Sequence, residues 1–241
     1  MLAELHALAG KLEAVAGRSL DPDRLAAAIR LHRDIDAHRA ALLDGRASLP
    51  LDDRELYALL RRGEWLWPEE HLSELRLARA LLGTGKPQAG VPVLVTGYVP
   101  EPAATLAILN GAGAFVAADD YAAVGRRLVR EADLPVSDPW EALLERYLGA
   151  PPCPTRSADQ GARMRHLAAL LDRSSSRGVL IHVVKFCEPE LFDVPAIRRT
   201  FAARGVPVLY LEGELERQLS GQVETRIEAF VEMLSGARGA A

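Results

Sequence analysis

Four short runs of β-branched and other apolar residues, separated by segments with helical periodicity, constrain the fold of this chain most strongly. The runs cover residues 91–96, 114–118, 178–184 and 206–211. The helical segments cover residues 102–113, 121–148, 163–173, 195–204 and 224–234, with breaks in the second near Pro135 and Pro139. Strands that alternate with helices require right-handed crossovers. They predict an α/β fold, a small, open, mostly parallel sheet with helices on both faces.

The residues before this pattern carry helical periodicity and almost no strand signal. A first helix is expected to end near Gly17, and its apolar residues recur at spacings of three and four. These residues are Leu5, Leu8, Leu12 and Val15. Asp21 and Pro22 suit an N-cap and a first helical position, which predicts a second helix to about residue 43. Two more helices are expected over residues 52–62 and 68–82.

Trp65 and Trp67 fall in the turn between the last two of these helices. Because tryptophan buries a large apolar area, we interpret both as packing anchors, with ligand stacking as the alternative. The character of the sequence changes in the glycine-containing residues 83–90. We therefore predict a helical segment at residues 1–88 and an α/β domain at residues 89–241.

Charge and cysteine content exclude several classes of protein. The 241 residues carry a formal net charge of −4, which does not indicate a basic face for nucleic acid. Two cysteines are too few for a disulfide framework and fit a reducing cytosol. The amphipathic N-terminus is unlike a signal peptide, and no apolar run approaches the ~20 residues that span a bilayer. We expect a cytoplasmic protein with neither nucleic acid nor membrane as partner.

Ligands of open parallel sheets bind beyond the carboxyl ends of the strands, so the residues at these ends are candidates for a site. They are Gly97 and Tyr98, Asp119 and Asp120, residues 185–190 and residues 212–214. The adjacent carboxylates Asp119 and Asp120 are compatible with a metal site and equally with the N-cap of a helix. His182, inside the third strand, is interpreted as a core or interface histidine.

Cys187 is the most notable of the residues near these ends, because it follows a buried strand and stands two residues from Lys185. The positive charge is expected to favour its thiolate, which suits a nucleophile or a metal ligand. The alternative is a small buried hydrophobic residue, and this is also our interpretation of Cys153 in its proline-rich loop. Neither a CxxC motif nor a histidine at zinc-site spacing accompanies either cysteine.

From about residue 90 to the end, the chain resembles the 2-hydroxyacyl-CoA dehydratase and benzoyl-CoA reductase family. Three segments carry the resemblance: GVLIHVVKFCEPELFDVP at 178–195, GVPVLYLE at 205–212 and GQVETRIEAFVEM at 221–233. Weaker matches are GAFVAADD at 113–120 with Gly125 and Arg126, and RYL at 146–148 before the Cys153 loop. The preceding helical region also fits the middle segment of the family.

The resemblance implies a subunit that binds a 4Fe-4S cluster through three cysteines, with one iron open to a substrate carbonyl oxygen. In such enzymes, one-electron reduction of an acyl-CoA thioester gives a ketyl radical anion that expels a hydroxyl group as water. The electron comes from a separate ATP-dependent iron–sulfur activator protein. Cys187 matches the last of the three family cysteines and is our candidate cluster ligand.

The candidate pocket residues beside Cys187 are Gly97, Asp120, Lys185, Glu188 and Arg226. Arg126 and Arg226 are candidates for phosphate contacts, with exposure or pairing to carboxylates as the alternative. Which acyl group is bound is not indicated by the sequence.

The sequence departs from the family in its first 85 residues, which contain no cysteine. Family members carry an additional N-terminal α/β domain with the other two cluster cysteines, and the chain is expected to lack it. One hypothesis is therefore a dehydratase or reductase subunit that works with a second dehydratase-type subunit or the missing half. The second is a non-catalytic relative that serves as a subunit-interaction module. A third, with Cys187 as a nucleophile, predicts selective alkylation of Cys187 over Cys153.

Overall fold

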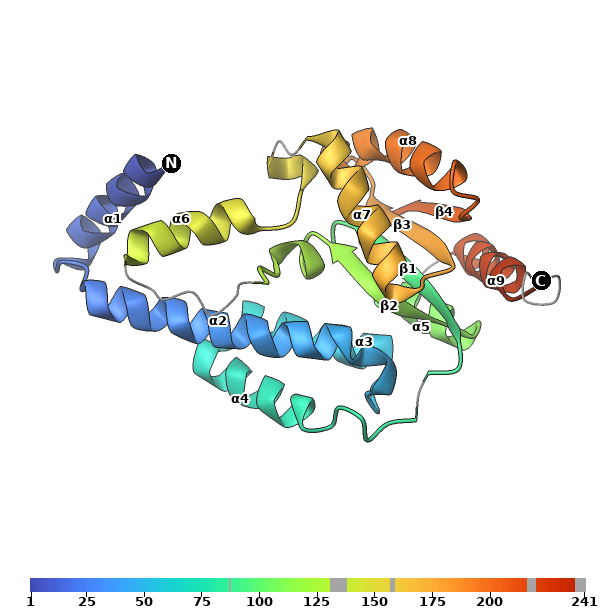
Figure 1. Cartoon of the computed structure of the whole chain (residues 1–241), viewed down its shortest axis with the longest axis horizontal. Coiled ribbons are helices and arrows are strands. Elements are labelled where there is room, and N and C mark those ends of the chain that lie inside the picture. The colour runs from blue at the N-terminus through green and yellow to red at the C-terminus, as the bar shows by residue number, and fades with distance from the viewer. Residues whose placement is uncertain (87, 131–137, 157–158, 216–219, 237–241) are drawn as a thin grey trace.

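The computed structural model describes residues 1–86, 88–130, 138–156, 159–215 and 220–236. Its centre is a sheet of four parallel strands in the spatial order β2-β1-β3-β4 (Figure 1). The strands are β1 at Val91–Gly97, β2 at Ala114–Tyr121, β3 at Gly178–Val184 and β4 at Val208–Gly213. Each overlaps a run that the sequence predicts, so the α/β class with a parallel sheet is confirmed.

Helices cover both faces of this sheet, as predicted (Figure 1). On one face, α7 at Gln160–Ser174 and α8 at Glu188–Ala202 pack against buried side chains such as Leu94 and Ile181. On the other face, α5 at Ala104–Gly111 and α9 at Gly221–Gly236 pack against Val93 and Leu180. The side chains of each strand alternate between the two faces, and both sets are apolar because neither face meets water.

Four helices precede the sheet: α1 at Leu2–Ala16, α2 at Pro22–Asp44, α3 at Asp53–Arg61 and α4 at Pro68–Arg79. The Asp21 carboxylate accepts hydrogen bonds from the first turn of α2, and Asp52 forms a capping box with Glu55 at the start of α3. No helix in the described ranges has both the length and the apolar composition needed to cross a bilayer.

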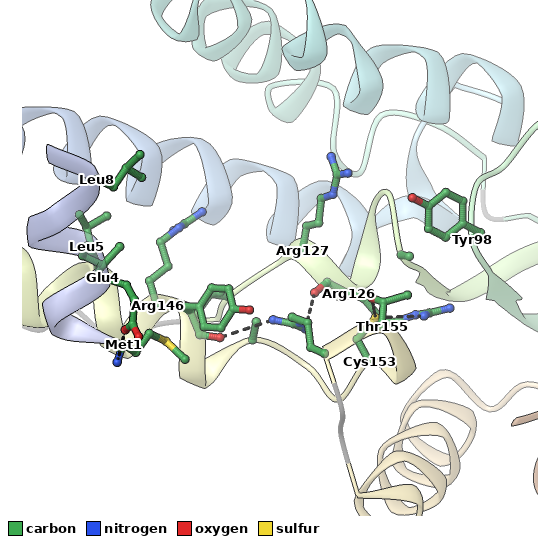
Figure 2. A pocket seen from close by; sticks show the side chains of 16 residues that line it. Met1, Glu4, Leu5, Leu8, Tyr98, Arg126, Arg127, Arg146, Cys153 and Thr155 are labelled. Carbon is green, nitrogen blue, oxygen red and sulfur yellow. Dashed lines mark hydrogen bonds and ion pairs between the residues drawn. The ribbon is translucent and has the colours of Figure 1, made fainter. Parts of the chain in front are cut away.

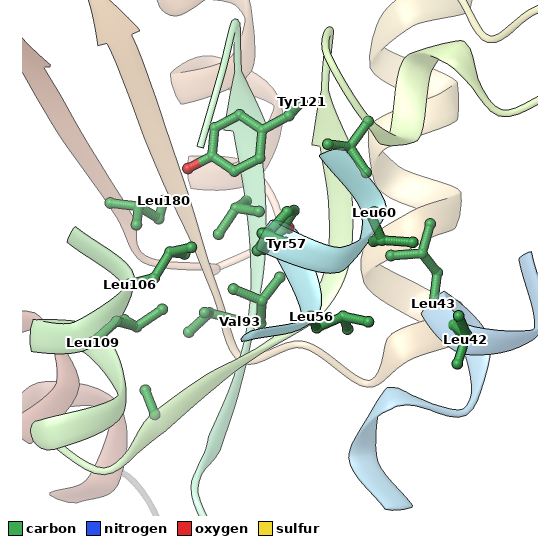
Figure 3. Packing of buried hydrophobic residues seen from close by; sticks show 14 of the residues in the cluster. Leu42, Leu43, Leu56, Tyr57, Leu60, Val93, Leu106, Leu109, Tyr121 and Leu180 are labelled. Carbon is green, nitrogen blue, oxygen red and sulfur yellow. The ribbon is translucent and has the colours of Figure 1, made fainter. Parts of the chain in front are cut away.

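The helical region and the sheet share one hydrophobic cluster. Leu42 and Leu60 from the helices lie in the same buried group as Val93, Leu106 and Leu180, and Figure 3 shows this packing. Two separately folded domains would each be expected to have a core of their own. The predicted boundary between a helical segment at residues 1–88 and a domain at residues 89–241 stays a prediction. The hydrophobic core is continuous across it.

One expectation about the helical region is wrong. Trp65 and Trp67 are 66% and 75% exposed, so they do not anchor packing within this chain, where Leu60, Leu72 and Leu75 fill the adjacent core. The first helix forms as predicted and ends at Gly17, and its apolar stripe is not buried. No residue of α1 is fully buried, and Leu12 is 60% exposed. Spacing predicts a helix, but it does not say whether a partner covers its apolar stripe.

Two helix boundaries also differ from the prediction. Among the described residues of the expected helical region at 121–148, a 3₁₀ turn forms at Gly125–Arg127 and α6 at Pro139–Gly149, so α6 begins at the expected break near Pro139. The expected break at Pro135 lies outside the described residues. In contrast, α8 begins at Glu188 rather than near Pro195. Pro189 suits the first turn of α8. The helix continues past its internal Pro195, where the neighbouring Val194 and Ile197 are buried.

The order of the strands places a topological switch point between β1 and β3, because successive connections run to opposite sides of this pair. Gly97 ends β1 there with φ of 154°, and a Cβ at this residue would lie 1.9 Å from the His182 carbonyl oxygen. Only glycine allows the two backbones to approach so closely. The switch point is therefore where a ligand crevice is expected in this fold.

Candidate functional site

Arg126 lies beside the carboxyl ends of β1 and β2 with its side chain fully enclosed. The 3₁₀ turn after β2 directs it inward, where Nη2 donates to the Gly97 carbonyl oxygen and Nε donates to that of Asp120 at 2.7 Å. Its guanidinium also forms a two-pronged ion pair with Glu190 of α8, with N–O distances of 2.5 and 2.9 Å. Arg126 thus joins the ends of β1 and β2 to the start of α8.

A second buried arginine, Arg163 of α7, completes this network. It donates to both carboxylate oxygens of Asp120, at 2.9 and 2.6 Å, and to Asp193 at 3.1 Å. Thr96 donates its hydroxyl to Asp120 at 2.6 Å. Burial alone would raise the pKa of Asp120, but the guanidinium groups of Arg163 and Arg126 hold it well below its usual range.

The two cysteines border this network from different sides. The Sγ of Cys153 accepts from Arg126 Nη1 at 3.4 Å and lies 3.0 Å from the Thr155 hydroxyl. Burial would raise the pKa of this thiol, but the hydroxyl and the guanidinium outweigh it and lower the pKa. Cys187 is the N-cap residue of α8, and its pKa is raised by burial, which the backbone N–H of Glu190 and the charge of Arg126 only partly offset.

The expectation that Lys185 favours a Cys187 thiolate is therefore wrong. The pKa of Cys187 is raised, and the ammonium group of Lys185 lies 2.8 Å from the Glu214 carboxylate. Glu188 is exposed at the first turn of α8, and Arg226 donates to the Tyr210 carbonyl oxygen at 2.7 Å. Of the predicted pocket residues, Gly97 and Asp120 are brought together through Arg126. The other three, Lys185, Glu188 and Arg226, lie outside the network.

Neither Asp119 nor Asp120 is the N-cap of a described helix, and the metal role that the sequence left open stays a prediction. Asp120 forms the buried ion pairs, whereas Asp119 accepts from the backbone N–H groups of Tyr121 and Gly125. His182 is buried, as predicted, and burial lowers its pKa to about 4. Arg126 pairs with carboxylates, which is the alternative to a phosphate contact that the sequence left open.

A cavity of about 660 Å³ lies next to this network, and Arg126 and Cys153 are among the residues that line it. Figure 2 shows Leu5 and Leu8 of α1 at one end and Tyr98 at the other, with Cys153 and Thr155 toward the Tyr98 end. Further arginines line the cavity: Arg127, Arg146 and Arg156. It therefore combines a cationic wall, a thiol of lowered pKa and an apolar end formed by α1.

Sequence reasoning misses several of these residues. The ion pair of Arg126 with Glu190 joins positions 64 residues apart, and no local pattern marks Arg163 as a buried partner of Asp120. Glu190 does fall within the candidate segment after the third strand. Cys153 is expected from sequence to be a buried hydrophobic residue, and only the tertiary contacts show the hydroxyl and guanidinium that stabilise its thiolate.

The residues of this chain do not fit a cluster held by three cysteines. The sequence contains two cysteines, and in the part of the chain that the structure describes no three His, Cys, Asp or Glu side chains are grouped to hold a metal ion. The Sγ of Cys153 is directed instead at a guanidinium group. A three-thiolate set would need residues from outside these 241.

Comparison with known proteins places the chain in a family. Residues 1–234 match the model described as 2-hydroxyglutaryl-CoA dehydratase, D-component. The chain is 24% identical over 238 residues to lactoyl-CoA dehydratase subunit beta of Anaerotignum propionicum, covering 97% of this chain and 64% of the relative. It is 23% identical over 232 residues to the (R)-phenyllactyl-CoA dehydratase beta subunit of Clostridium sporogenes, covering 93% and 60%.

A reductase is among the relatives as well. A benzoyl-CoA reductase subunit of Thauera aromatica is 25% identical over 221 residues, covering 86% of this chain and 55% of the relative. The chain thus spans about 60% of the length of the curated relatives it matches. Because the family model matches nearly the whole sequence, the chain belongs to the 2-hydroxyglutaryl-CoA dehydratase D-component family.

Proposed function

We propose that this chain is a subunit of a 2-hydroxyacyl-CoA dehydratase or benzoyl-CoA reductase-like enzyme that acts on an acyl-CoA thioester. The single observation that carries this proposal is the arginine-lined cavity at the carboxyl ends of β1 and β2, in a chain that the family model matches over residues 1–234. In a parallel sheet this is the edge where ligands bind.

The cavity residues would bind and orient the substrate. Arg127 has an exposed side chain that pairs with Glu64 at 3.6 Å, and Arg156 donates to the carbonyl oxygens of Pro151 and Tyr147. Both would turn further N–H groups toward phosphate oxygens. Arg126 is held by Glu190 and Asp120 and cannot swing toward a ligand without breaking buried ion pairs. Its role is to fix the floor of the cavity and to stabilise the Cys153 thiolate.

Any cluster would be shared with a second polypeptide, because this chain holds too few cysteines by itself. We propose Cys187 as the thiolate that this chain would contribute. The resemblance implies that such a cluster supplies one electron to the thioester for a ketyl-radical reaction and is itself charged by an ATP-dependent activator. The residues of this chain would hold and position the substrate, and the shared cluster would supply the electron.

Anaerobic co-expression with the polypeptide encoded immediately upstream tests this proposal. The purified complex should contain iron and acid-labile sulfide in similar amounts and show broad charge-transfer absorption. Cys187→Ser should remove the iron while the complex stays intact, and Cys153→Ser, the matched control, should retain it. A colourless, iron-free complex of the unmodified chains would rule out a shared cluster.

A non-catalytic role as a subunit-interaction module is the second candidate, and the exposed apolar stripe of α1 favours it. Because no α1 residue is fully buried, this helix can be removed without opening the core. Deletion of α1 should then abolish assembly with a full-length homologue, while Cys187→Ala leaves the turnover of the complex unchanged. Retained assembly without α1 would contradict this reading.

A further inference from the structure

A second cavity continues the arginine-lined one along the first helix. It has a volume of about 470 Å³ and lies between α1, the start of α2 and α6. The two cavities share three lining residues, Leu5, Leu8 and Leu143, so they lie next to each other along α1. We call the two together the α1 trough.

The two ends of the α1 trough differ in chemistry. In the cavity that also includes Tyr98, Arg127 and Arg156 provide positive charge, with Arg127 paired to Glu64 at 3.6 Å. Among the described residues, the hydrogen-bond partners of Arg156 are backbone carbonyl oxygens, so its charge is not neutralised by a direct carboxylate contact. This end suits a phosphate group, for which arginine is well matched.

The other end combines apolar side chains along α1 with four charged residues, Glu13, Arg18, Asp21 and Arg24. Leu12, Leu25 and Trp140 line it together with the alanines Ala9, Ala16 and Ala28. Half of the Leu8 side-chain surface and more than half of that of Leu12 remain exposed. Apolar surface of this kind gains about 25 cal/mol for each Å² that a ligand removes from water. The ring of Trp140 also contacts that of His6, with 4.3 Å between centroids, which holds α1 beside α6.

We propose that the α1 trough binds an acyl-CoA whose acyl group is large and apolar, with the phosphates at Arg127 and Arg156 and the acyl chain along α1. This inference rests on the proposed function and narrows its substrate class. A short acyl group would leave Leu12 and Trp140 uncovered.

Tryptophan fluorescence of the full chain measures this binding directly, without cluster or turnover. A Trp65→Phe/Trp67→Phe background leaves Trp140 as the reporter, because the sequence has three tryptophans. The probes are acetyl-CoA, glutaryl-CoA, decanoyl-CoA, free CoA and decanoate. Decanoyl-CoA should bind at least ~10-fold more tightly than acetyl-CoA or glutaryl-CoA, since burial of two methylene groups already gives a gain of this size.

Matched variants identify the two ends of the trough. Leu12→Ser should weaken decanoyl-CoA binding ~10-fold and leave acetyl-CoA binding unchanged, while Leu77→Ser, at an exposed leucine of α4 outside the trough, should change neither. Arg127→Gln should weaken every CoA compound and spare decanoate. Arg130→Gln, which removes an exposed arginine paired with Asp44, is the control.

The outcomes separate this inference from the proposed function. Equal affinity for acetyl-CoA and decanoyl-CoA, or binding that Leu12→Ser does not alter, would overturn the inference and leave the proposed function standing. Binding of decanoate without binding of any CoA compound would overturn the proposed function, and the acyl-CoA assignment with it. Chain-length dependence that Leu12→Ser removes would support the inference.

Discussion

Arg126 joins residues from four separate parts of the chain: Gly97 at the end of β1, Asp120 in β2, Cys153 in a loop and Glu190 in α8. A buried ion pair of this kind adds little compared with a well-packed apolar pair, because both charges must leave water. Removing one partner is different, since the remaining charge is then buried without compensation. The arginine is therefore expected to be intolerant of neutral substitution.

Arg126→Gln should lower the free energy of unfolding by about 3–5 kcal/mol, because Glu190 loses its buried counter-ion. Arg130→Gln is the control: its ion pair with Asp44 is exposed, and the expected loss is about 0–1 kcal/mol. Urea unfolding followed by circular dichroism measures both. Similar losses in the two variants would show that the buried network contributes no more to stability than the exposed ion pair does.

The two thiols differ in the charges and hydroxyl groups around them, and this difference can be titrated. The pKa of Cys153 is lowered and that of Cys187 is raised. As pH increases, the Cys153 thiolate should therefore form first. This order is opposite to the one expected if Cys187 were an activated nucleophile.

In the single-thiol variants Cys187→Ser and Cys153→Ser, the pH midpoint of alkylation should be lower for Cys153 than for Cys187. Midpoints rather than rates are compared, because the two thiols differ in access to the reagent. Mass spectrometry after timed treatment with iodoacetamide gives both values. Thr155→Val should raise the midpoint of Cys153 and leave that of Cys187 in place, since it removes a hydroxyl that lowers only the first pKa. The reverse order of midpoints would refute this account.

At the scale of elements, the approach of β1 to β3 positions the site. The carbonyl oxygen of Gly97 receives Arg126, and its Cα faces the His182 backbone across the strand pair. Any side chain at this point separates the strands at the topological switch point. The carboxyl end of the sheet is thus set by backbone sterics as well as by ion pairs.

Gly97→Ala should destabilise the fold by about 2 kcal/mol or more, because the residue has a positive φ and its Cβ would clash with backbone rather than with a flexible side chain. Gly111→Ala in α5, where an added Cβ meets nothing within 4 Å, should be neutral or stabilising. Thermal unfolding of the two variants gives the comparison. A tolerated alanine at position 97 would mean that the strands can separate at little cost.

At the scale of the whole molecule, the shared cluster connects the helical region to the sheet. Leu60 in α3 is 1% exposed and lies in one buried group with residues of β1, α5 and α9. The two predicted parts should therefore unfold together. Their separation in sequence does not imply separate stability.

Leu60→Ala should destabilise the strands as well as the helices, with a total loss of about 2–5 kcal/mol, because it leaves a cavity in the shared core. Native-state hydrogen exchange would show the same loss of protection in β1 and α3. Leu77→Ala, at an exposed leucine of α4, provides a control with little expected effect. If protection fell only in the helices, residues 1–88 and 89–241 would be independent folding units.

Local patterns in the sequence are sufficient for the elements and the family. Alternation of apolar runs with helical spacing predicts the four parallel strands, and the Asp21-Pro22 cap places the start of α2 correctly. The segment around Cys187 carries the resemblance that the family model supports. These features depend on neighbours within a few residues or on recognisable motifs, and both are visible in a linear chain.

The tertiary structure decides which side chains meet. It buries Arg126 against Glu190, directs Cys153 toward a guanidinium group and leaves Trp65, Trp67 and the α1 stripe in solvent. Each of these outcomes depends on residues distant in sequence, so no local spacing encodes them. Burial and charge pairing are properties of the packed whole, and for this reason the sequence identified the family while only the fold located the cavity.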